Sequence, residues 1–378
     1  MRPHILHLHS SFNLGGKEAR AVQLMNHFGD RARHTIVSGV PDQLGARDAI
    51  AQGIAYEIAQ DPPPLTGKPS VARYEAIARY LRRFDLVLTY NWGAVDGVMA
   101  RRVFSKGQPP LVHHEDGFNA DEAGGLKAER NAYRRIALGA AHALVVPSQT
   151  LEAIALKVWN QPRGRVHRIF NGIDVARYAA PPEREAIPGF RRKPGEVVIG
   201  TLAGLRDVKD LPLLVRSVGG LAGRVRLVIV GEGPERARIE QAARAMGLGE
   251  QFLLPGFLPD PHRYVGHFDI MALSSWSEQF PISVVEAMAA GVPVVAPPVG
   301  DVPMMIADIN QPYIAEHRGE VWLRDALQAL VNDEALRKAI GEANRAKAVQ
   351  RYDAATMFAA YTALYASALG RPGAFGET

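Results

Sequence analysis

Two carboxylates flank an apolar run in the second half of the chain. The stretch is SEQFPISVVEAMAAGVPVVAP, residues 277–297, and it places Glu278 and Glu286 eight positions apart. A helix turns about 100° per residue, so the two acids would not share one helical face. Pro281 favours a helix that begins near it. We therefore expect Glu278 on a loop and Glu286 on a helix, where Ser283 has the spacing of a capping box with Glu286.

Two further stretches could bind a phosphate group. TLAGLRDVKDLPLLVRSV, residues 201–218, places Arg206 and Lys209 before an apolar helix. Cations at a helix start oppose the helix dipole, so a diphosphate would balance them; a solvated surface is the alternative. Gly15 and Gly16, in SFNLGGKEARAV, open another expected helix. They would let the backbone approach a phosphate, although a tight turn from strand to helix explains them equally well.

A pair of histidines beside acids could serve as a base or bind a metal ion. LVHHEDGFNADEAG, residues 111–124, holds His113, His114, Glu115 and Asp116. Neighbouring residues on a strand point to opposite faces, so the two histidines do not easily serve one site. No third ligand with metal spacing can be identified, and we expect no metal site.

The elements that must position these residues repeat along the chain. Short runs of Val, Ile and Leu alternate with turns and helix-period segments, which predicts parallel sheets covered on both faces. Such sheets bind ligands beyond the carboxyl ends of their strands. VGEGPERARIE, residues 230–240, is similar to a dinucleotide fingerprint, but Arg236 stands where the third Gly should be, and a plain turn into a helix fits at least as well. The runs lie at 4–10, 34–40, 86–90, 110–115 and 143–148, and at 197–204, 226–233, 251–257, 270–275 and 293–300.

Length and composition fit a globular protein of two domains. The chain has 378 residues, of which 47% are hydrophobic and 22% charged. The join is expected in 168–196, where Pro, Gly and charge replace periodicity. The absence of cysteine excludes disulfides and a cysteine nucleophile and agrees with a cytoplasmic location, and secretion is not expected from the first residues. A net charge of +5 favours anionic partners.

Taken together, these features resemble the retaining GT-B glycosyltransferases of family four, over nearly the whole chain. The most specific piece is SEQFPISVVEAMAAGVPVVAPPVGDVP, which is similar to the family's signature of acid, Phe-Pro, acid, Ala-Met-Ala-x-Gly-x-Pro-Val-Val and a later Val-Gly. FNGID (170–174) and GGKEARAV (15–22) are similar to two weaker landmarks. The resemblance implies an α/β fold of two doubly wound, Rossmann-like domains facing a cleft, with a C-terminal helix crossing back to the first. The domains would be 1–172, completed by 355–378, and 173–354.

The resemblance also implies an activity and its residues. The chain would move a hexose from a UDP- or GDP-sugar, with retention and without a metal or other cofactor, to a glycan or polyprenyl-diphosphate-linked acceptor in bacterial cell-envelope or exopolysaccharide synthesis. Its catalytic residues would be Glu278, Lys209 and His114, with His113 as the alternative histidine. The nucleotide and diphosphate would meet Gly15, Gly16, Arg206, Lys209, Ser283 and Glu286, and the donor sugar Glu278, Gln279 and Phe280.

Two positions depart from the family pattern. Gly204 stands where the family has Arg, so diphosphate binding would depend on Lys209 with Arg206 as a substitute. Gln279 follows the first acid where the family has Gly, which leaves the donor's identity open. The alternative functions are a non-catalytic nucleotide-sugar sensor or scaffold, and an epimerase or phosphorylase on the same fold.

A basic helical face could meet a membrane. Lys127, Arg130 and Arg134 lie on one face of a probable helix, which suits peripheral contact with anionic lipid at the cytoplasmic side of the inner membrane. A solvated face is the alternative. Nucleic acid is not an expected partner, because aromatic platforms for base stacking are not evident.

Overall fold

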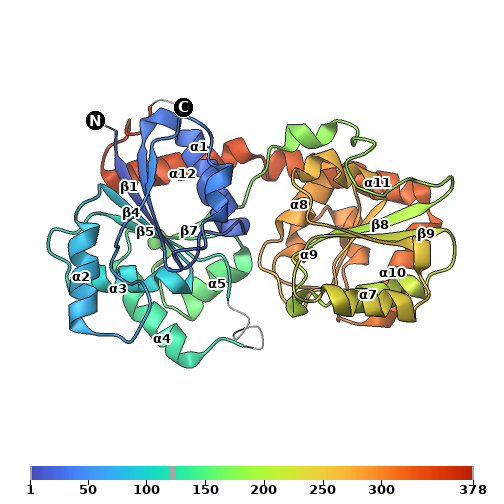
Figure 1. The fold of residues 1–378 in the computed structure, drawn as a ribbon, viewed down its shortest axis with the longest axis horizontal. Helices are drawn as coiled ribbons and strands as arrows, with labels where there is room; N and C mark the ends of the chain where they lie inside the picture. Colours follow the sequence, from blue (N-terminus) through green and yellow to red (C-terminus); the bar gives the residue numbers. More distant parts are fainter. Residues whose placement is uncertain (1, 119–121, 123–124, 377–378) are drawn as a thin grey trace. The chain divides into compact units, whose positions relative to one another are not determined.

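Each half of the chain builds its own parallel sheet, as the recurring apolar runs predict (Figure 1). The computed structural model describes residues 2–118, 122 and 125–376, so the stretch beyond Phe118 in 111–124 is described only at Glu122. By its contacts the chain divides into two units. Unit 1 comprises Met1–Asn171 and Met357–Thr378, and unit 2 comprises Gly172–Thr356.

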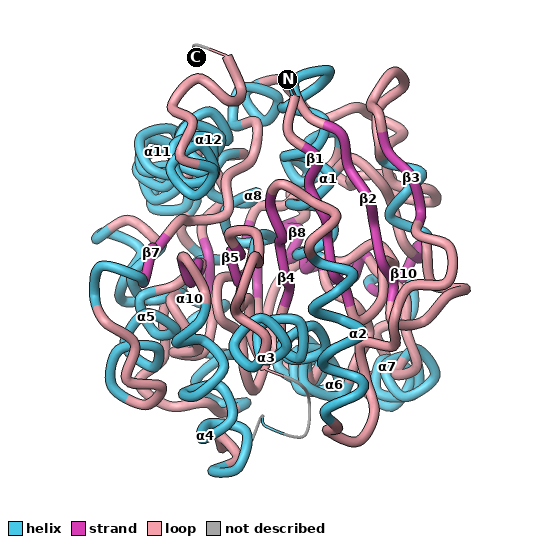
Figure 2. The backbone as a smooth tube through the Cα atoms, turned by 90° about the vertical axis from the view of Figure 1, so that its left-hand side faces the viewer, coloured by secondary structure: helices cyan, strands magenta, loops and turns pink. Residues whose placement is uncertain are grey.

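The sheet of unit 1 has seven strands, all parallel. Figure 2 shows the first three along the chain side by side. The five runs expected in the first half all form strands, whereas the two outermost strands, of three residues each, were not expected. Across the sheet the strands are β3 (Tyr56–Ile58), β2 (Arg33–Ser38), β1 (His4–His9), β4 (Leu86–Tyr90), β5 (Leu111–His114), β6 (Ala143–Val146) and β7 (Val166–Arg168).

Helices cover both faces of this sheet. Leu86, Leu88 and Tyr90 of β4 pack in a cluster with the first and last helices of the unit, while Val87 packs on the other face. This alternation is the period of two that a strand imposes. The helices are α1 (Gly16–Phe28) and α12 (Ala354–Leu369) on the first face, α2 (Val71–Leu81) and α3 (Val95–Val103) on the second, and α4 (Ala128–Ala137) and α5 (Gln149–Lys157).

The C-terminal helix docks on unit 1. Tyr361 and Tyr365 of α12 are fully buried, and they pack in one cluster with Ile5 of β1 and Phe28 of α1. The apolar spacing of residues 353–369 predicts a helix with a docking face, and both the helix and its burial are confirmed.

Unit 2 contains a sheet of five parallel strands, one at each of the runs expected in the second half, although β9 begins one residue before its run. Across the sheet these are β10 (Phe252–Gly256), β9 (Val225–Val230), β8 (Val197–Leu202), β11 (Ile270–Ala272) and β12 (Val294–Val295). The helices are α6 (Leu211–Gly219), α7 (Arg236–Ala245), α8 (Ile282–Ala289), α9 (Val302–Met305), α10 (Glu320–Asn332) and α11 (Glu334–Arg351).

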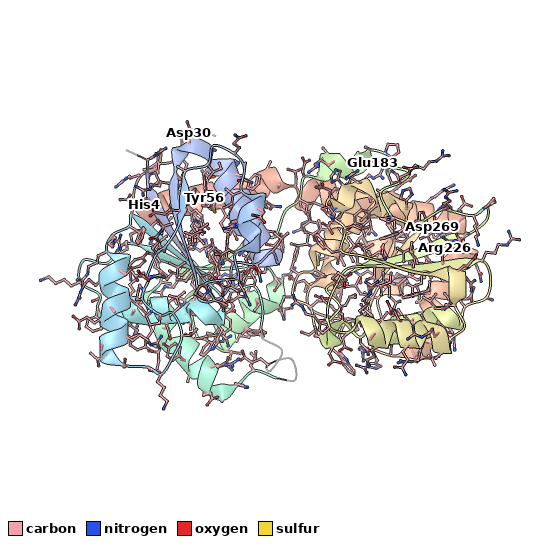
Figure 3. All side chains as sticks on the ribbon, viewed as in Figure 1. His4, Asp30, Tyr56, Glu183, Arg226 and Asp269 are labelled. Atoms are coloured by element: carbon pink, nitrogen blue, oxygen red, sulfur yellow. The ribbon has the colours of Figure 1, made fainter. Side chains whose placement is uncertain are left out.

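Charged pairs fix the amino ends of the strands in unit 2. The carboxylate of Asp269 accepts hydrogen bonds from the backbone N–H of Val198, at 2.7 Å, and from Arg192, at 2.5 Å. Figure 3 labels Asp269 and Arg226 in unit 2. Arg226 donates to Glu196 at 3.0 Å. These contacts join the starts of β8, β9 and β11, whose opposite ends lead into the loops with the predicted site residues.

The FNGID motif lies where the chain passes from unit 1 to unit 2. Ile173 N–H donates to Tyr352 C=O at 3.0 Å, and Ala354 N–H donates to Ile173 C=O at 2.8 Å. A Cβ on Gly172 would lie 2.8 Å from Ala354 Cα, so only glycine fits without a backbone shift. The motif therefore packs against residues 352–354, the segment that leads into α12.

We expect Gly172→Ala to destabilise the protein by about 1–3 kcal/mol, because the added methyl group overpacks against backbone that cannot rotate away. Gly164→Ala is the matched control, since a Cβ there would meet nothing within 4 Å. Thermal unfolding of both variants checks this. Equal midpoints for the two variants would contradict the account of the motif.

Candidate functional site

A cation and a carboxylate meet at the carboxyl ends of β8 and β11. Lys209 Nζ lies 2.5 Å from Glu278 Oε1, and Ser275 Oγ donates to the same oxygen at 2.7 Å. Lys209 belongs to a short 3-10 helix, η8 (Asp207–Lys209), and Glu278 lies on a loop, as expected. The structure thus joins two of the predicted site residues, 69 positions apart, at one edge of the sheet.

Two glycines after β9 support the loop that leads to Lys209. Gly231 and Gly233 have φ of 151° and 155°, which favours glycine. A Cβ at Gly231 would lie 1.8 Å from Ala203 O, and one at Gly233 would lie 2.4 Å from Leu205 O. The GEG turn therefore lets two loops approach closely, which agrees with its interpretation as a plain turn.

Arg206 covers the space beside Gly204. Both residues are exposed, and a Cβ on Gly204 would lie 3.4 Å from Arg206 Nε. The guanidinium of Arg206 therefore lies next to the position that a side chain at residue 204 would occupy. This places a second cation in the loop between β8 and Lys209.

A third glycine shapes the loop that carries Glu278. Gly300 has φ of 53°, and a Cβ there would lie 2.3 Å from Glu278 O. Asp301 N–H donates to Gln279 C=O at 3.0 Å. The side-chain oxygen of Gln279 is buried, and none of the described residues donates a hydrogen bond to it. Gln279 therefore directly follows the ion-paired Glu278 with an amide oxygen that is shielded from solvent.

The Phe280 ring is not available to a sugar. Its side chain is buried and packs edge-on against Tyr352, with ring centroids 5.6 Å apart. The expectation that Phe280 lies at the donor sugar is therefore corrected, since its ring anchors the loop in the core and only its backbone could meet a ligand.

The capping box at the start of α8 does not form. The helix begins at Ile282 with Pro281 at the N-cap, and no side chain caps it. Ser283 is already inside the first turn, so its hydroxyl cannot take the capping position. The interpretation of Glu286 as a capping partner is therefore wrong, and Ser283 makes no cap.

Glu286 is instead paired with a tyrosine that the sequence did not single out. Tyr178, in η7 (Val175–Ala179), donates its hydroxyl hydrogen to Glu286 Oε1 at 3.2 Å. Burial raises the pKa of Glu286 to about 7, and the hydrogen bond from Tyr178 acts in the opposite direction. Glu286 therefore holds a carboxyl group poised near neutral pH on the helix expected to carry it.

The turn at Gly15 and Gly16 begins a helix, as predicted, but the carboxylate of Glu18 lies beside it. Gly15 is the N-cap of α1, and a Cβ on it would lie 2.9 Å from Glu18 Oε2. Glu18 is buried and forms an ion pair with Lys17. A negative charge in the first turn of a helix competes with an anionic ligand for the exposed N–H groups, so the turn attracts a phosphate less than Gly15 and Gly16 alone suggest.

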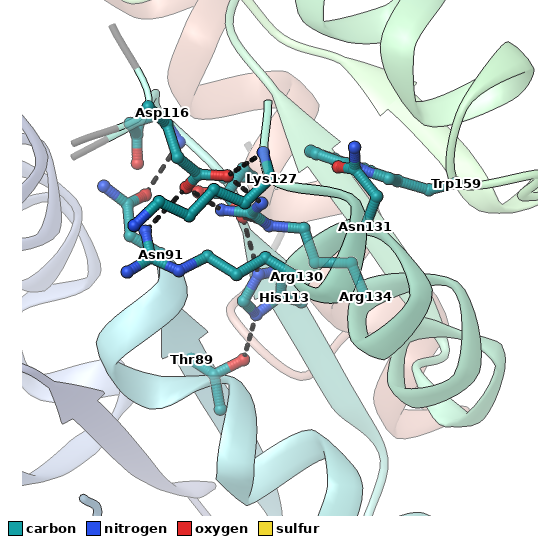
Figure 4. A network of polar contacts seen from close by, with 11 residues as sticks. Thr89, Asn91, His113, Asp116, Lys127, Arg130, Asn131, Arg134 and Trp159 are labelled. Carbon is teal, nitrogen blue, oxygen red and sulfur yellow. Dashed lines mark hydrogen bonds and ion pairs between the residues drawn. The ribbon is translucent and has the colours of Figure 1, made fainter. Parts of the chain in front are cut away.

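An ion pair joins α1 to the ends of β4 and β5. Arg20 donates to Asp116 through both guanidinium nitrogens, one at 2.8 Å, and to Asn171 Oδ1 at 3.0 Å. Asn91 Oδ1 accepts from Asp116 N–H at 2.7 Å, a contact visible in Figure 4. Asn171, in the FNGID motif, thus has a structural partner within unit 1.

His114 lies in the core of unit 1. Its side chain is 1% exposed, and its ring nitrogens contact Thr89 O at 3.2 Å and Tyr365 Oη at 2.8 Å. Burial lowers its pKa well below the ordinary value. This position disagrees with the role expected for His114 at a transferred sugar, because both nitrogens have partners and α12 covers the ring. His113 points to the opposite face, as predicted, where its ring contacts Thr89 Oγ1 at 2.7 Å.

The basic face of α4 points inward. Arg134 is fully buried and contacts Glu115 and Glu122, each at 3.2 Å, while Arg130 contacts Glu122 at 3.0 Å (Figure 4). The guanidinium of Arg134 also lies 5.2 Å from the centroid of the Trp159 ring. The expected membrane-landing face is therefore wrong at Arg130 and Arg134, because buried carboxylates and an aromatic ring attract both cations inward.

The described part of the chain shows neither a cluster of metal ligands nor a membrane-spanning helix. Within it, no three or more His, Asp or Glu side chains are grouped so that they could hold a metal ion. None of its helices is both long and apolar enough to cross a membrane.

Two family models match consecutive parts of the chain. Residues 183–347 match glycosyl transferases group 1, and residues 14–177 match Glycosyltransferase Family 4. N-acetyl-alpha-D-glucosaminyl L-malate synthase of Bacillus anthracis is 24% identical over 54% of this chain and 54% of that protein. D-inositol 3-phosphate glycosyltransferase of Mycobacterium marinum is 25% identical over 63% of this chain and 54% of that protein. The chain thus spans about half the length of these curated relatives.

Solved structures show a similar fold over almost the whole chain. The crystal structure of Anabaena HepE in complex with UDP is similar with a TM-score of 0.78, at 20% identity, over 97% of this chain and 100% of that one. The HepE complex with UDP-glucose gives a TM-score of 0.75 at 21% identity, with the same coverage.

We expect Glu286→Gln to stabilise the protein increasingly as the pH rises from 5 to 8. In the folded state the pKa of Glu286 is about 7, against an ordinary 4.5. The folded wild type therefore binds more protons than the unfolded chain, and its free energy of unfolding falls as the pH rises through this window. Gln keeps the acceptor for Tyr178 and cannot ionise. Thermal midpoints measured across this pH range test the point, with Glu232→Gln as an exposed control. A pH-independent difference between Glu286→Gln and wild type would count against the raised pKa.

Proposed function

The chain belongs to the group 1 glycosyltransferases with a GT-B fold, and from this membership we propose that it transfers a hexose from a nucleotide-sugar donor to a hydroxyl acceptor. The observation that supports this most is the ion pair of Lys209 with Glu278 at 2.5 Å. It combines a cation for a diphosphate with a carboxylate for a sugar at the edge where parallel sheets bind ligands.

The chemistry of transfer needs both charges. When the bond between the anomeric carbon and the diphosphate oxygen breaks, negative charge develops on the leaving oxygen and positive charge on the sugar. Lys209 and the exposed Arg206 would stabilise the leaving diphosphate, and Glu278 would face the sugar. A hydroxyl oxygen of the acceptor then bonds to the anomeric carbon, and its proton leaves with the diphosphate or with solvent.

The nucleotide would meet α8. Glu286 can accept hydrogen bonds from the two hydroxyls of a ribose when it is ionised, and its pKa of about 7 makes this dependent on pH. We propose UDP- or GDP-sugars as donors, with UDP-sugars first because HepE, which shares the fold, was crystallised with UDP-glucose. Retention of configuration and transfer without a metal ion are part of the proposal, and the configuration of the product and activity in a chelator test them.

Our proposals for the acceptor and for the biosynthetic process rest on the family resemblance. We propose a glycan or polyprenyl-diphosphate-linked acceptor in bacterial cell-envelope or exopolysaccharide synthesis. A cytoplasmic location agrees with the absence of cysteine. The inward-pointing arginines of α4 give membrane contact no support.

A second candidate function is a nucleotide-sugar binding protein that does not catalyse transfer. The burial of His114, the histidine expected at the transferred sugar, favours this alternative. It would bind nucleotide sugars without turnover of the donor by hydrolysis or transfer, so product analysis separates the two functions.

We expect Lys209→Ala to lower kcat/KM for the donor by about 100-fold or more, because an electrostatic stabiliser of the leaving group is removed. Lys193→Ala is the control, since Lys193 forms an ion pair with Glu250 at 3.0 Å and both side chains are exposed. Release of free nucleotide from the preferred donor is the measurement. Turnover by Lys209→Ala at the wild-type rate would show that the site is wrongly assigned.

We expect donor affinity to rise with pH around a midpoint near 7, because only ionised Glu286 accepts from both ribose hydroxyls. Tyr178→Phe removes the hydrogen bond that favours the ionised form and moves the midpoint to higher pH. Tyr352→Phe is the matched control, because that buried hydroxyl donates to Met305 C=O at 3.2 Å. Calorimetric titrations at several pH values decide, and an unmoved midpoint in Tyr178→Phe would refute this role for Tyr178.

A further inference from the structure

Trp276 is exposed and nevertheless held in place. Its side chain is 60% exposed, although its backbone N–H donates to Val208 C=O at 2.8 Å. One face of the indole is covered by Arg318, whose Cζ lies 3.3 Å from a ring centroid of Trp276. Among the described residues, no second cation and no aromatic ring packs on the indole, and its exposure leaves the other face open. A large apolar ring fixed on one side and open on the other needs an explanation.

Arg318 is itself anchored, so it fixes the ring. Its Nε donates to Ser274 C=O at 3.1 Å, and its terminal nitrogen forms an ion pair with Asp210. Only 16% of each of these two charged side chains is exposed. Asp210 neutralises the cation beneath Trp276, so the open face of the indole does not attract an anion.

The Trp276 indole and the Arg318 guanidinium that supports it, here called the platform, lie at the same edge of unit 2 as the ion pair of Lys209 with Glu278. Trp276 precedes Glu278 by two residues on one loop, and Asp210 directly follows Lys209. Ser274 Oγ also donates to Lys209 C=O at 2.8 Å, which ties the two loops together. A ligand held by Lys209 and Glu278 therefore lies near the segment that presents the indole.

We propose that the open face of Trp276 stacks on a pyranose ring. Such a ring has a face of C–H groups that matches an aromatic surface, and its hydroxyls suit the neighbouring carboxylate of Glu278, two residues along the same loop. The inference rests on the proposed function, because it assigns a sugar subsite at the same strand edge. The ring could come from the donor's sugar or from a glycan acceptor, and the two sources give different results in the experiment below.

Calorimetric titration of wild type and Trp276→Ala with UDP, UDP-glucose, GDP and GDP-mannose tests the donor source. Maltose, followed by tryptophan fluorescence, tests a glycan. For a donor sugar we expect the nucleotide sugar to bind about tenfold more weakly to the variant while the free nucleotide binds equally well. For a glycan we expect maltose binding to be lost while the nucleotide sugars are unaffected. Trp276→Phe should restore most of the lost affinity in either case.

Val321→Ala is the control variant, because Val321 is also 60% exposed but lies on α10. The inference is overturned if Trp276→Ala binds the nucleotide sugars and maltose with the affinities of wild type. It is also overturned if wild type does not bind maltose and binds each nucleotide sugar no more tightly than the free nucleotide. Failure of wild type to bind any nucleotide, with or without sugar, overturns the proposed function instead, and maltose then tests the platform alone.

Discussion

The contact between Lys209 and Glu278 depends on how closely two loops of unit 2 can approach. At Gly231, Gly233 and Gly300 a side chain would meet backbone oxygen at 1.8, 2.4 and 2.3 Å, so these positions set the path of both loops. The same loops carry Arg206 beside Gly204, the buried Phe280 ring and the amide oxygen of Gln279, to which none of the described residues donates a hydrogen bond.

The strand ends of the two units carry different electrostatics. In unit 1 the charges at this edge pair with each other, Lys17 with Glu18 and Arg20 with Asp116. In unit 2, Lys209 pairs with Glu278 and Arg318 with Asp210, but Arg206 is exposed and Glu286 has a pKa near 7. Arg206 is therefore a charge at this edge that suits a diphosphate, and it lies within residues 183–347, which match the group 1 glycosyltransferase model.

Patterns that act over short distances along the chain were readable from the sequence. The ten apolar runs form strands, Gly16 begins a helix, and Glu278 and Glu286 lie on a loop and a helix. Contacts between distant residues were not readable. Tyr178 reaches Glu286 across 108 positions and Tyr365 covers His114 across 251, and neither pairing leaves a local signal. The capping box failed for a local reason, since Pro281 starts the helix before Ser283 can cap it.

A thermal-shift screen of the whole chain against UDP-, GDP- and ADP-sugars addresses the central claim most directly, because a ligand that binds only the folded state stabilises it by mass action. The account predicts a raised unfolding midpoint with sugars of one nucleotide, and a much smaller rise for Lys209→Ala. No shift with any nucleotide sugar, or an equal shift in wild type and Lys209→Ala, would contradict it.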